Sequence, residues 1–577
     1  MGGLYFSRGR SEIGSVCLDS VYHHRGWLCG GVEWLSLTFA VISQKNLSYI
    51  LKLYSEKASA YPGFSPIVMD HLTGGGGEKI SLGERIRSTA TMRAVVCDVI
   101  SEQYREVGMS MNGRLEKLRK IESGTVTTGH QLQLCGGPAF FHYKIITTIR
   151  LARKLEKESG RGVVPIFWLA SEDHDFKEVS WVNGESEKFV WSNPLENSKL
   201  PVGKLSLEGI EEVVNDWGGN GVNLMESEAV MLELQKAKEN GEKYVHLFRR
   251  WLELWYGDTE LLVLDASHPK LKNTAAALFA DEFTGSGIAN AVLKTTEDLK
   301  LRGFKVGTHI RDVNLFFQKG DGERVGIVKN GDGFLAGKTV INSEGEDWGD
   351  WCIKNAEFLS PGVLLRPLYQ EFLLSNSHVV LGPGELGYWK QLEGAFQIRE
   401  IVMPVLHLRD HVLVLSEELL SNAAQVGWSI EKGWWGEEEW TKVWLEGKMP
   451  SGIVDLEEKL SEFKRLSVEV AVVTDSTLEG AALASGATMD KAIGNLLKKI
   501  GKAIKRQNEQ FLKDLSSSAL KIYSKGSPQD RYMNFHILSR DVGGFYQLRN
   551  LLLEFDCSRE KAVCEFMHVV SSVNENK

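Results

Sequence analysis

The sequence lacks the features that would place it in several common classes of protein. Its 577 residues include only seven cysteines, at positions 17, 29, 97, 135, 352, 557 and 564, and no CxxC pair. This pattern argues against structural zinc and a disulfide framework, and it is typical of a reducing compartment. No apolar run reaches the roughly 18 residues of a membrane span. The apolar stretch 34–42 is short and follows Glu33, which makes it a poor signal peptide. We therefore expect a cytoplasmic protein.

The chain also has no excess of basic residues. Lysine and arginine total 67 against 76 aspartates and glutamates, which gives a net charge of −9. Such a chain has no global positive charge to hold a polyanion, so neither nucleic acid nor a membrane is an expected partner. Hydrophobic residues make up 43% and charged residues 25%, as in soluble globular proteins.

Short apolar segments alternate with helical patterns through the first 415 residues. The expected strands are GTVTTG (124–129), VVPIFWLA (163–170), LLVLDAS (261–267), HVVLGPGE (378–385) and IVMPVLHL (401–408). A helix expected at about 139–158 joins the first two strands into a βαβ unit, which yields a parallel sheet with a right-handed crossover. The predicted fold class is α/β, with a Rossmann-like parallel-sheet core.

We divide the chain by these changes of pattern. A helical pattern is expected from Leu47, after an extension without a sustained period. The expected divisions are 1–46 (N-terminal extension), 47–183 (first part of the core), 184–225 (insertion), 226–284 (core continued), 285–345 (connecting insertion), 346–415 (last part of the core), 416–525 (helical coiled-coil arm) and 526–577 (C-terminal helical segment).

The arm is expected from apolar residues spaced in threes, fours and sevens. They are Leu456, Leu460, Phe463 and Val470 in one stretch, and Met489, Ile493, Leu496, Ile500 and Ala503 in the other. This spacing predicts an antiparallel pair of helices, with glycines 480 and 486 favouring the hairpin. Ile504, Phe511 and Leu515 lie off the seam, which favours a second copy of the chain as cover and hence a homodimer.

Ligands of an open parallel sheet bind beyond the carboxyl ends of its strands, so the residues that follow the strands are candidates. TTGHQLQLCGGP (127–138) meets a helix N-terminus that could hold a carboxylate or phosphate, or it is an ordinary tight turn. It is no Walker loop, because GxxxxGK[ST] is absent. Cys135 lies in this turn, but no histidine partner can be assigned to it as a nucleophile.

Two further clusters follow strands. SEDHDF (171–176) surrounds His174 with carboxylates, which would favour the charged imidazolium and suit acid–base work, although a solvated acidic turn is the alternative. Metal binding there lacks a second histidine at ligand spacing. LGPGELGYW (381–389) precedes a helix whose aromatic rings could line a ligand or serve as core. Arg366 and Gln370 could clamp a carboxylate, or Arg366 could form a structural salt bridge.

Five strings in this order carry a resemblance to a known family: TTGHQLQLCGGPAFFHYKIITTIRLA, VPIFWLASEDHDFKEVSWV, LLVLDASHPKLK, SPGVLLRPLYQEFLL and LGPGELGYWKQL. Together they resemble the bacillithiol-biosynthesis cysteine-adding (cysteine ligase) family from about Leu47 to the end. The resemblance implies a Rossmann-like core related to class I aminoacyl-tRNA synthetases and a coiled coil that pairs two subunits. It also implies the last step of bacillithiol biosynthesis, in which L-cysteine is joined to the amine of glucosaminyl malate.

The resemblance assigns candidate site residues by motif. The catalytic candidates are Asp173, His174 and Asp175, and the substrate-binding candidates are Thr128, Gly129, His130, Gln131, Gly384, Glu385, Tyr388 and Trp389, with Arg366 and Gln370 for the malate carboxylate. This chain has His130 where the family carries glutamine.

The chemistry requires activation of the cysteine carboxyl, so ATP or another nucleotide is the expected cofactor, and no metal site is assignable. The alternative is a nucleotidyltransferase or adenylate-forming ligase of the same fold that acts on another small substrate.

Overall fold

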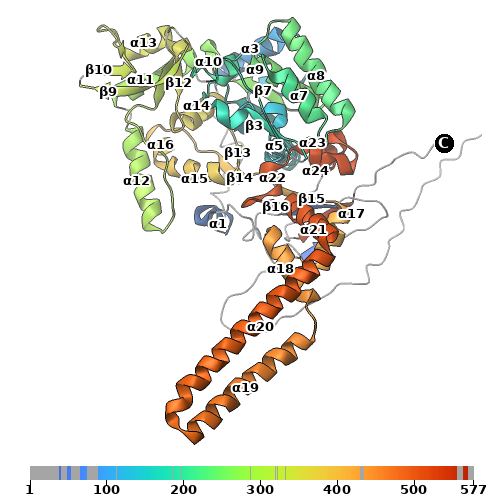
Figure 1. The fold of residues 1–577 in the computed structure, drawn as a ribbon. Helices are drawn as coiled ribbons and strands as arrows, with labels where there is room; N and C mark the ends of the chain where they lie inside the picture. The colour runs from blue at the N-terminus through green and yellow to red at the C-terminus, as the bar shows by residue number, and fades with distance from the viewer. Residues whose placement is uncertain are drawn as a thin grey trace, which may run out of the picture. The chain divides into compact units, whose positions relative to one another are not determined.

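The computed structural model describes residues 38–40, 49–53, 65–73, 89–111, 113–185, 187–196, 198–285, 287–318, 320, 322–331, 333–428, 434–554 and 563–568, and the fold is reported over these residues. Figure 1 shows the arrangement of their helices and strands.

The central sheet consists of five parallel strands in the order β14-β13-β3-β4-β7. Their bounds are β3 Gly124–His130, β4 Val163–Leu169, β7 Leu262–Asp265, β13 His378–Leu381 and β14 Val405–Leu408. The predicted α/β class and parallel core are therefore confirmed. The crossover helix between the first two strands, α5, spans Phe140–Ser159. This order brings the carboxyl ends of β13, β3 and β4 to one edge, where a ligand site is expected.

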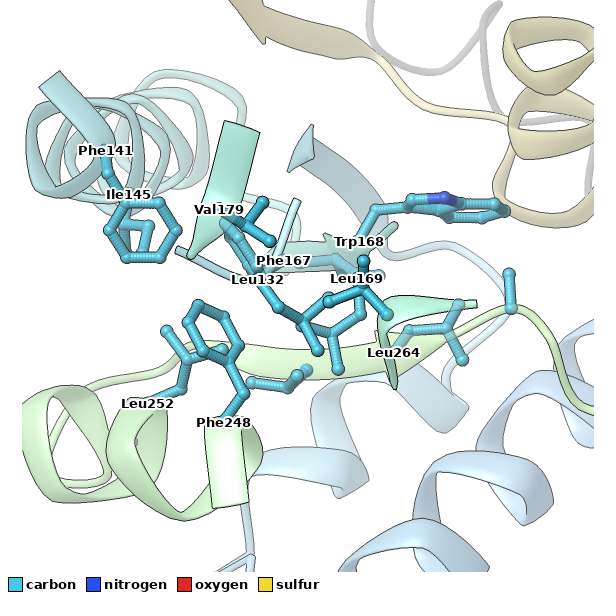
Figure 2. Close-up of a cluster of buried hydrophobic side chains, with 14 of the residues drawn as sticks. Leu132, Phe141, Ile145, Phe167, Trp168, Leu169, Val179, Phe248, Leu252 and Leu264 are labelled. Carbon is cyan, nitrogen blue, oxygen red and sulfur yellow. The ribbon is translucent and has the colours of Figure 1, made fainter. Parts of the chain in front are cut away.

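The strand β4 is apolar throughout because both of its faces are covered. Phe167 lies 5.5 Å, centroid to centroid, from Phe141 of α5, which in turn lies 5.7 Å from Phe248 of α9 (Tyr244–Tyr256). Figure 2 shows these three rings converging from the strand and two helices, while Trp168 points away from them. Alternation along the strand thus sends one side chain into this core and its neighbour toward the opposite face.

Helices surround and extend the sheet. Their bounds are α1 Pro66–Thr73, α3 Ala90–Glu106, α4 Arg114–Arg119, α6 Phe176–Val179, α7 Ile210–Gly218, α8 Leu224–Glu239, α9 Tyr244–Tyr256, α10 Pro269–Thr274, α11 Ala276–Thr284, α12 Ile288–Leu301, α13 Trp348–Lys354, α14 Leu365–Leu374, α15 Pro383–Gln391, α16 Glu393–Ile398, α17 Glu417–Gln425, α18 Glu437–Lys448, α19 Gly452–Thr474, α20 Glu479–Gln507, α21 Glu509–Ile522, α22 Gln529–Tyr532, α23 Phe535–Ser539 and α24 Phe545–Glu554. Of these described helices, none combines the length and hydropathy needed to cross a membrane.

A second sheet of five strands comes mostly from the segment that the sequence suggested as a connecting insertion. It has the order β11-β10-β9-β8-β12 and is antiparallel. Its strands are β8 Leu315–Gln318, β9 Arg324–Asn330, β10 Gly333–Ala336, β11 Thr339–Ile341 and β12 Leu359–Pro361. There are also two short antiparallel strand pairs, β5 Trp181–Asn183 with β6 Lys188–Val190, and β16 Tyr523–Ser524 with β17 Ser527–Pro528 after the arm.

A four-stranded sheet corrects two expectations. Its order is β1-β18-β2-β15, with β1 Thr38–Ala40, β2 Tyr49–Leu53, β15 His411–Leu415 and β18 Val563–His568. The helical pattern expected from Leu47 is therefore wrong at β2, because a short apolar run has no reliable period and here pairs with β15. The C-terminal segment, expected to be helical, likewise contains a strand.

The helical arm consists of α19 and α20, which run side by side (Figure 1). The predicted antiparallel pair is confirmed, but the predicted glycine hairpin is wrong. The chain turns at residues 475–478, where the Asp475 side chain accepts a hydrogen bond from the Thr477 amide. Gly480 and Gly486 lie inside α20, and a Cβ at Gly486 would come within 3.1 Å of the Lys464 side chain. Gly486 therefore serves the close approach of the two helices.

The off-seam residues that favoured a dimer have a different role. Leu515 is buried in a separate cluster around Trp440 and Trp444, and Ile504 and Phe511 pack against that cluster. They cover the base of the arm within one chain, so they do not argue for a second copy.

The late segment around Asn534 closes the turn that follows β3. The buried Asn534 amide donates to the carbonyl oxygens of Cys135 and Gly137, at 3.0 and 2.7 Å. The Ala139 amide donates to the Met533 oxygen at 2.7 Å. Two segments separated by almost 400 positions thus supply hydrogen-bond partners for each other's backbone groups.

We predict that Asn534→Ala lowers the free energy of unfolding by about 3 kcal/mol, because it leaves two buried carbonyls unpaired and removes the cap of α23. Urea-induced unfolding followed by tryptophan fluorescence measures this change. The matched control is Asn240→Ala, whose exposed amide bonds only Glu242 and whose loss should cost less than about 0.5 kcal/mol. Equal stabilities of the two variants would contradict the role of Asn534.

Candidate functional site

A cavity of about 450 Å³ lies at the carboxyl ends of the central strands, and we call it the strand-end cavity. It brings together nine of the substrate-binding and catalytic candidates with several neighbours. The side chains that line it are Gly129, His130, Gln131, Trp168, Ala170, Asp173, Glu178, Val363, Arg366, Pro367, Gln370, Val379, Leu381, Glu385, Tyr388 and Trp389.

An ion pair between a buried lysine and a partly exposed glutamate supports one wall of this cavity. The Lys144 ammonium of α5, whose side chain is 1% exposed, donates to both Glu385 carboxylate oxygens at 2.9 and 2.7 Å. It also donates to the Gly129 carbonyl at 2.5 Å. Glu385 accepts the Gly382 amide at 2.7 Å, so it caps α15 as well. The sequence analysis missed Lys144 because its position in a long helix carries no local signal.

His130 is neutral at physiological pH in this setting. Burial, aided by repulsion from the Lys144 ammonium, lowers the pKa of His130 to about 4. One ring nitrogen, Nδ1, lies 3.2 Å from the Gln131 carbonyl oxygen. A carbonyl oxygen can only accept, so the neutral ring carries its proton on Nδ1 and presents Nε2 to a ligand as an acceptor.

Asp173 is held ionised at the point where the loop leaves β4. Gln131 donates to one carboxylate oxygen at 2.9 Å, and the His174 amide donates to the other at 2.8 Å. Burial raises the pKa of Asp173, but the attraction of Arg366 and the bond from Gln131 outweigh it, so the pKa lies below its usual value. The carboxylate is thus oriented and negatively charged.

The expected charge of His174 is wrong. Burial and the neighbouring Arg324 guanidinium lower the pKa of His174, and they outweigh the attraction of Asp173 and Asp175. Arg324 lies 3.3 Å from the Nδ1 atom, and a guanidinium can only donate, so Nδ1 is the acceptor. The neutral ring therefore carries its proton on Nε2. The sequence pattern showed only the carboxylates and could not reveal an arginine 150 residues away.

A second cavity of about 260 Å³ adjoins the first, and we call it the arginine pocket. Its walls share Asp173, Val363 and Arg366 with the strand-end cavity. The other lining residues are His174, His309, Arg311, Asn314, Phe316, Arg324 and Gly362. The inserted antiparallel sheet supplies Arg324 and Phe316, and the loop before it supplies Arg311. Sequence analysis missed these arginines because no motif joins positions so far apart.

The remaining candidates occupy different positions. The Thr128 hydroxyl donates to the Val380 carbonyl at 2.8 Å and joins two strands within the sheet. Gly384 and Asp175 are exposed and belong to the lining of neither cavity. Trp389 is buried and stacks on Phe396, yet its edge lines the strand-end cavity.

Gln370 lies at the back of the strand-end cavity. Its amide donates to Glu371 at 3.0 Å. Burial, partly offset by hydrogen bonds from Asn376, raises the pKa of Glu371 to about 7.

The sequence suggested that the turn at the start of α5 could bind a carboxylate or phosphate, but several of its backbone groups already have partners. The Gly136 and Gly137 amides bond within the turn, the Ala139 amide donates to Met533, and the Asn534 side-chain amide occupies two of the turn's carbonyls. Cys135 is buried there, and burial raises the pKa of its thiol. A buried, protonated thiol is unreactive, so Cys135 does not suit the role of a nucleophile.

A third cavity of about 330 Å³, at the ends of β4 and β7, provides a contrast. Its buried Lys272 ammonium is paired with Glu172, and its Arg249 guanidinium bonds Gln103 and the Val263 carbonyl. The Lys272 ammonium is thus neutralised by a carboxylate, whereas the hydrogen-bond partners of Arg324 are all neutral.

Two family profiles match consecutive parts of the chain. The profile described as "Bacillithiol biosynthesis BshC, N-terminal Rossmann-like domain" matches residues 78–410. The profile described as "Bacillithiol biosynthesis BshC, C-terminal coiled-coil domain" matches residues 412–556.

Similar proteins carry the name "Putative cysteine ligase BshC". The one from Flavobacterium johnsoniae is 30% identical over 471 residues, which cover 80% of this chain and 87% of the relative. The one from Christiangramia forsetii is 29% identical over 478 residues, with 80% and 87% covered. The one from Bacillus licheniformis is 26% identical over 477 residues, with 77% and 85% covered.

We predict that His174 stays neutral above pH 6.5 and that Arg324→Gln raises its pKa, because the variant removes the repulsion of the guanidinium. Histidine NMR across a pH titration measures both values, with the His174 signal assigned by its loss in His174→Gln. Arg302→Gln removes an exposed arginine outside the pocket and should leave the pKa unchanged. A His174 pKa above 6.5 in the unmodified protein would contradict this electrostatic picture.

Proposed function

The chain belongs to the BshC family of bacillithiol biosynthesis, and on that premise we propose that it is a cytoplasmic ligase that joins L-cysteine to glucosaminyl malate. The bond formed is an amide between the cysteine carboxyl and the glucosamine amine. The observation that carries the proposal is the ionised Asp173 carboxylate, which lines both cavities at their junction.

The reaction follows from this placement. The amine nitrogen attacks the activated cysteinyl carbonyl carbon, the carbon–nitrogen bond forms, and the bond to the activating group breaks. Asp173 is negative and oriented by Gln131, so it can hold the substrate amine and accept the proton that the nitrogen releases. His174 carries its proton on Nε2, which makes it a hydrogen-bond donor to the substrate in place of the base that its sequence position suggested.

Binding residues are assigned from the same geometry. Glu385 and Lys144 fix the wall that presents His130, and Tyr388 adds an aromatic surface. Arg366 lies at the junction of the cavities and is assigned to a malate carboxylate, with Gln370 behind it. Asp175 and Gly384 have no assigned contact with substrate.

Activation of the cysteine carboxyl needs a further reactant, because a free carboxylate is a poor electrophile. ATP or another nucleotide would supply an adenylate or phosphate leaving group. The α5 junction, which the sequence suggested for a phosphate, has its backbone groups engaged by Met533 and Asn534. With these groups engaged, the junction does not fit a phosphate.

The proposal is tested by incubating the protein with glucosaminyl malate and L-cysteine, with and without ATP, and identifying the products by their masses in mass spectrometry. We expect the amide product. Asp173→Asn should lower the rate at least about a hundredfold, since proton-transfer groups typically contribute that much.

Asp175→Asn is the matched control, because this neighbouring carboxylate is exposed and lines neither cavity. It should retain nearly full activity. His174→Ala should lose about as much activity as Asp173→Asn, whereas His174→Gln, which keeps an N–H donor, should retain more. Absence of the product under all conditions would refute the proposed reaction.

We extend the proposal to assembly through the arm. In residues 452–510 no side chain larger than glycine is fully buried. Seam residues remain open to solvent, with Phe463 at 45% and Leu496 at 47% exposed. A helical hairpin alone thus leaves an apolar stripe uncovered, and a second copy of the coiled-coil domain is the proposed cover.

We predict a homodimer in light scattering at micromolar concentration and a shift to monomers for Phe463→Glu/Leu496→Glu, because charges are strongly disfavoured in a coiled-coil seam. Leu301→Glu, at an equally apolar but 87% exposed position of α12, should leave the mass unchanged. A monomer mass for the unmodified chain would refute the dimer.

A further inference from the structure

Three guanidiniums gather in the arginine pocket without a paired carboxylate. The Arg324 side chain, only 5% exposed, donates to the Ser360 hydroxyl at 2.8 Å, to the Pro361 carbonyl at 3.2 Å and to His174. All of these partners are neutral. In the part of the chain that the structure describes, neither Arg311 nor Arg366 lies within ion-pair distance of a carboxylate, although Arg366 attracts Asp173 and lowers its pKa.

The surroundings hold these charges in place. The Arg324 guanidinium lies 3.7 Å from the centre of the Phe316 ring, and that of Arg311 lies 5.0 Å from it. A Cβ at Gly326 would lie 2.2 Å from an Arg311 terminal nitrogen, so the absence of a side chain there makes room for the guanidinium. The Phe316 ring and Gly326, from two neighbouring strands, thus fix the positions of Arg311 and Arg324, so the arrangement is more than a chance grouping of surface side chains.

The charges are unbalanced. Three guanidiniums line the pocket, and Asp173 is the carboxylate that lines it with them. Burial and repulsion from Arg366 lower the pKa of Arg324 to about 10. Like charges gathered in a partly buried space are costly unless an anion joins them. The excess of two positive charges equals the charge of a dianion.

We propose that the arginine pocket is a subsite for a dicarboxylate, and that it binds the malyl group of the amine substrate through Arg311, Arg324 and Arg366. The inference rests on the proposed function for the identity of the substrate. Planar guanidiniums pair with carboxylates through two parallel hydrogen bonds, which suits two carboxylates among three arginines.

Size and position favour this ligand over a nucleotide. At about 260 Å³ the pocket is smaller than the roughly 300 to 1,000 Å³ of sites that enclose a whole drug-sized molecule. It can take one end of a ligand whose remainder extends past Asp173 into the strand-end cavity. A malyl group held there leaves the sugar amine at the junction, beside the carboxylate assigned to receive its proton.

Equilibrium binding tests the subsite without turnover. Calorimetry with the full chain measures the affinity for glucosaminyl malate and for methyl glucosaminide, which lacks the carboxylates. We expect Arg311→Gln to lower the affinity for glucosaminyl malate about ten- to a hundredfold, which is the effect of losing a hydrogen bond to a charged group. Free L-malate should compete with glucosaminyl malate, and the monocarboxylate L-lactate should not. Affinity for methyl glucosaminide should not change.

Two variants serve as controls. Gly326→Ala keeps every charge but displaces the Arg311 guanidinium, so it should also lower the affinity for glucosaminyl malate. Arg302→Gln removes an arginine that likewise lies over a phenylalanine ring, Phe304, but outside the pocket, and it should bind as the unmodified protein does. Circular dichroism confirms that each variant is folded.

The outcomes separate this inference from the proposed reaction. If glucosaminyl malate binds in the Arg311-dependent way but no amide forms, the subsite stands and the reaction fails. Unchanged affinity in Arg311→Gln and Gly326→Ala overturns the subsite, even if product forms. If Arg311→Gln loses ATP binding while its affinity for glucosaminyl malate is unchanged, the pocket is assigned to nucleotide phosphates instead. Failure of glucosaminyl malate to bind the unmodified protein would also overturn the subsite.

Discussion

The ion pair between the buried Lys144 and Glu385 is the interaction on which the site depends. It joins α5, which follows β3, to α15, which follows β13, and Lys144 also donates to the Gly129 carbonyl near the end of β3. A charge buried this deeply is tolerated only with its partner and its hydrogen bonds in place. Removing either member would leave an unpaired charge at the cavity wall and would change the environment that keeps His130 neutral. The pair thus fixes both the shape and the charge of the strand-end cavity.

The central sheet could be predicted because its strands are buried on both faces. Such strands are short and almost wholly apolar, and β3 and β4 agree with the predicted bounds to within a residue. The long crossover helix has a regular apolar period and was predicted equally well. At β2 the five residues were too few to distinguish strand from helix. The hairpin of the arm failed for another reason: Gly486 is required for helix contact and not for a turn.

Most of the candidate site was predictable where it ends or follows a strand. The sequence pointed to His130, Gln131, Asp173 and Glu385 because each ends or follows a strand of the sheet, and the structure gathers them around one cavity. Arg366 was suggested by the chemistry of its guanidinium and also lines this cavity. The sequence could not point to Arg311 or Arg324, which come from an inserted antiparallel sheet and meet the core only in three dimensions. The same gap explains the wrong charge expected for His174. Local carboxylates predicted an imidazolium, whereas a distant guanidinium and burial decide the outcome.

The two kinds of cation near the sheet edge have different consequences. The Lys144 ammonium is neutralised by Glu385, so its role is to hold two helices at fixed positions. Arg324 satisfies its donors with a hydroxyl, a carbonyl and a neutral ring, none of which cancels its charge. Hydrogen bonding therefore orients the guanidinium while the attraction for an anion remains available to a ligand. Hydrogen bonds already hold the guanidinium in position, but no carboxylate neutralises it. The pocket is therefore preorganised for an anionic substrate, because binding needs little rearrangement of the protein.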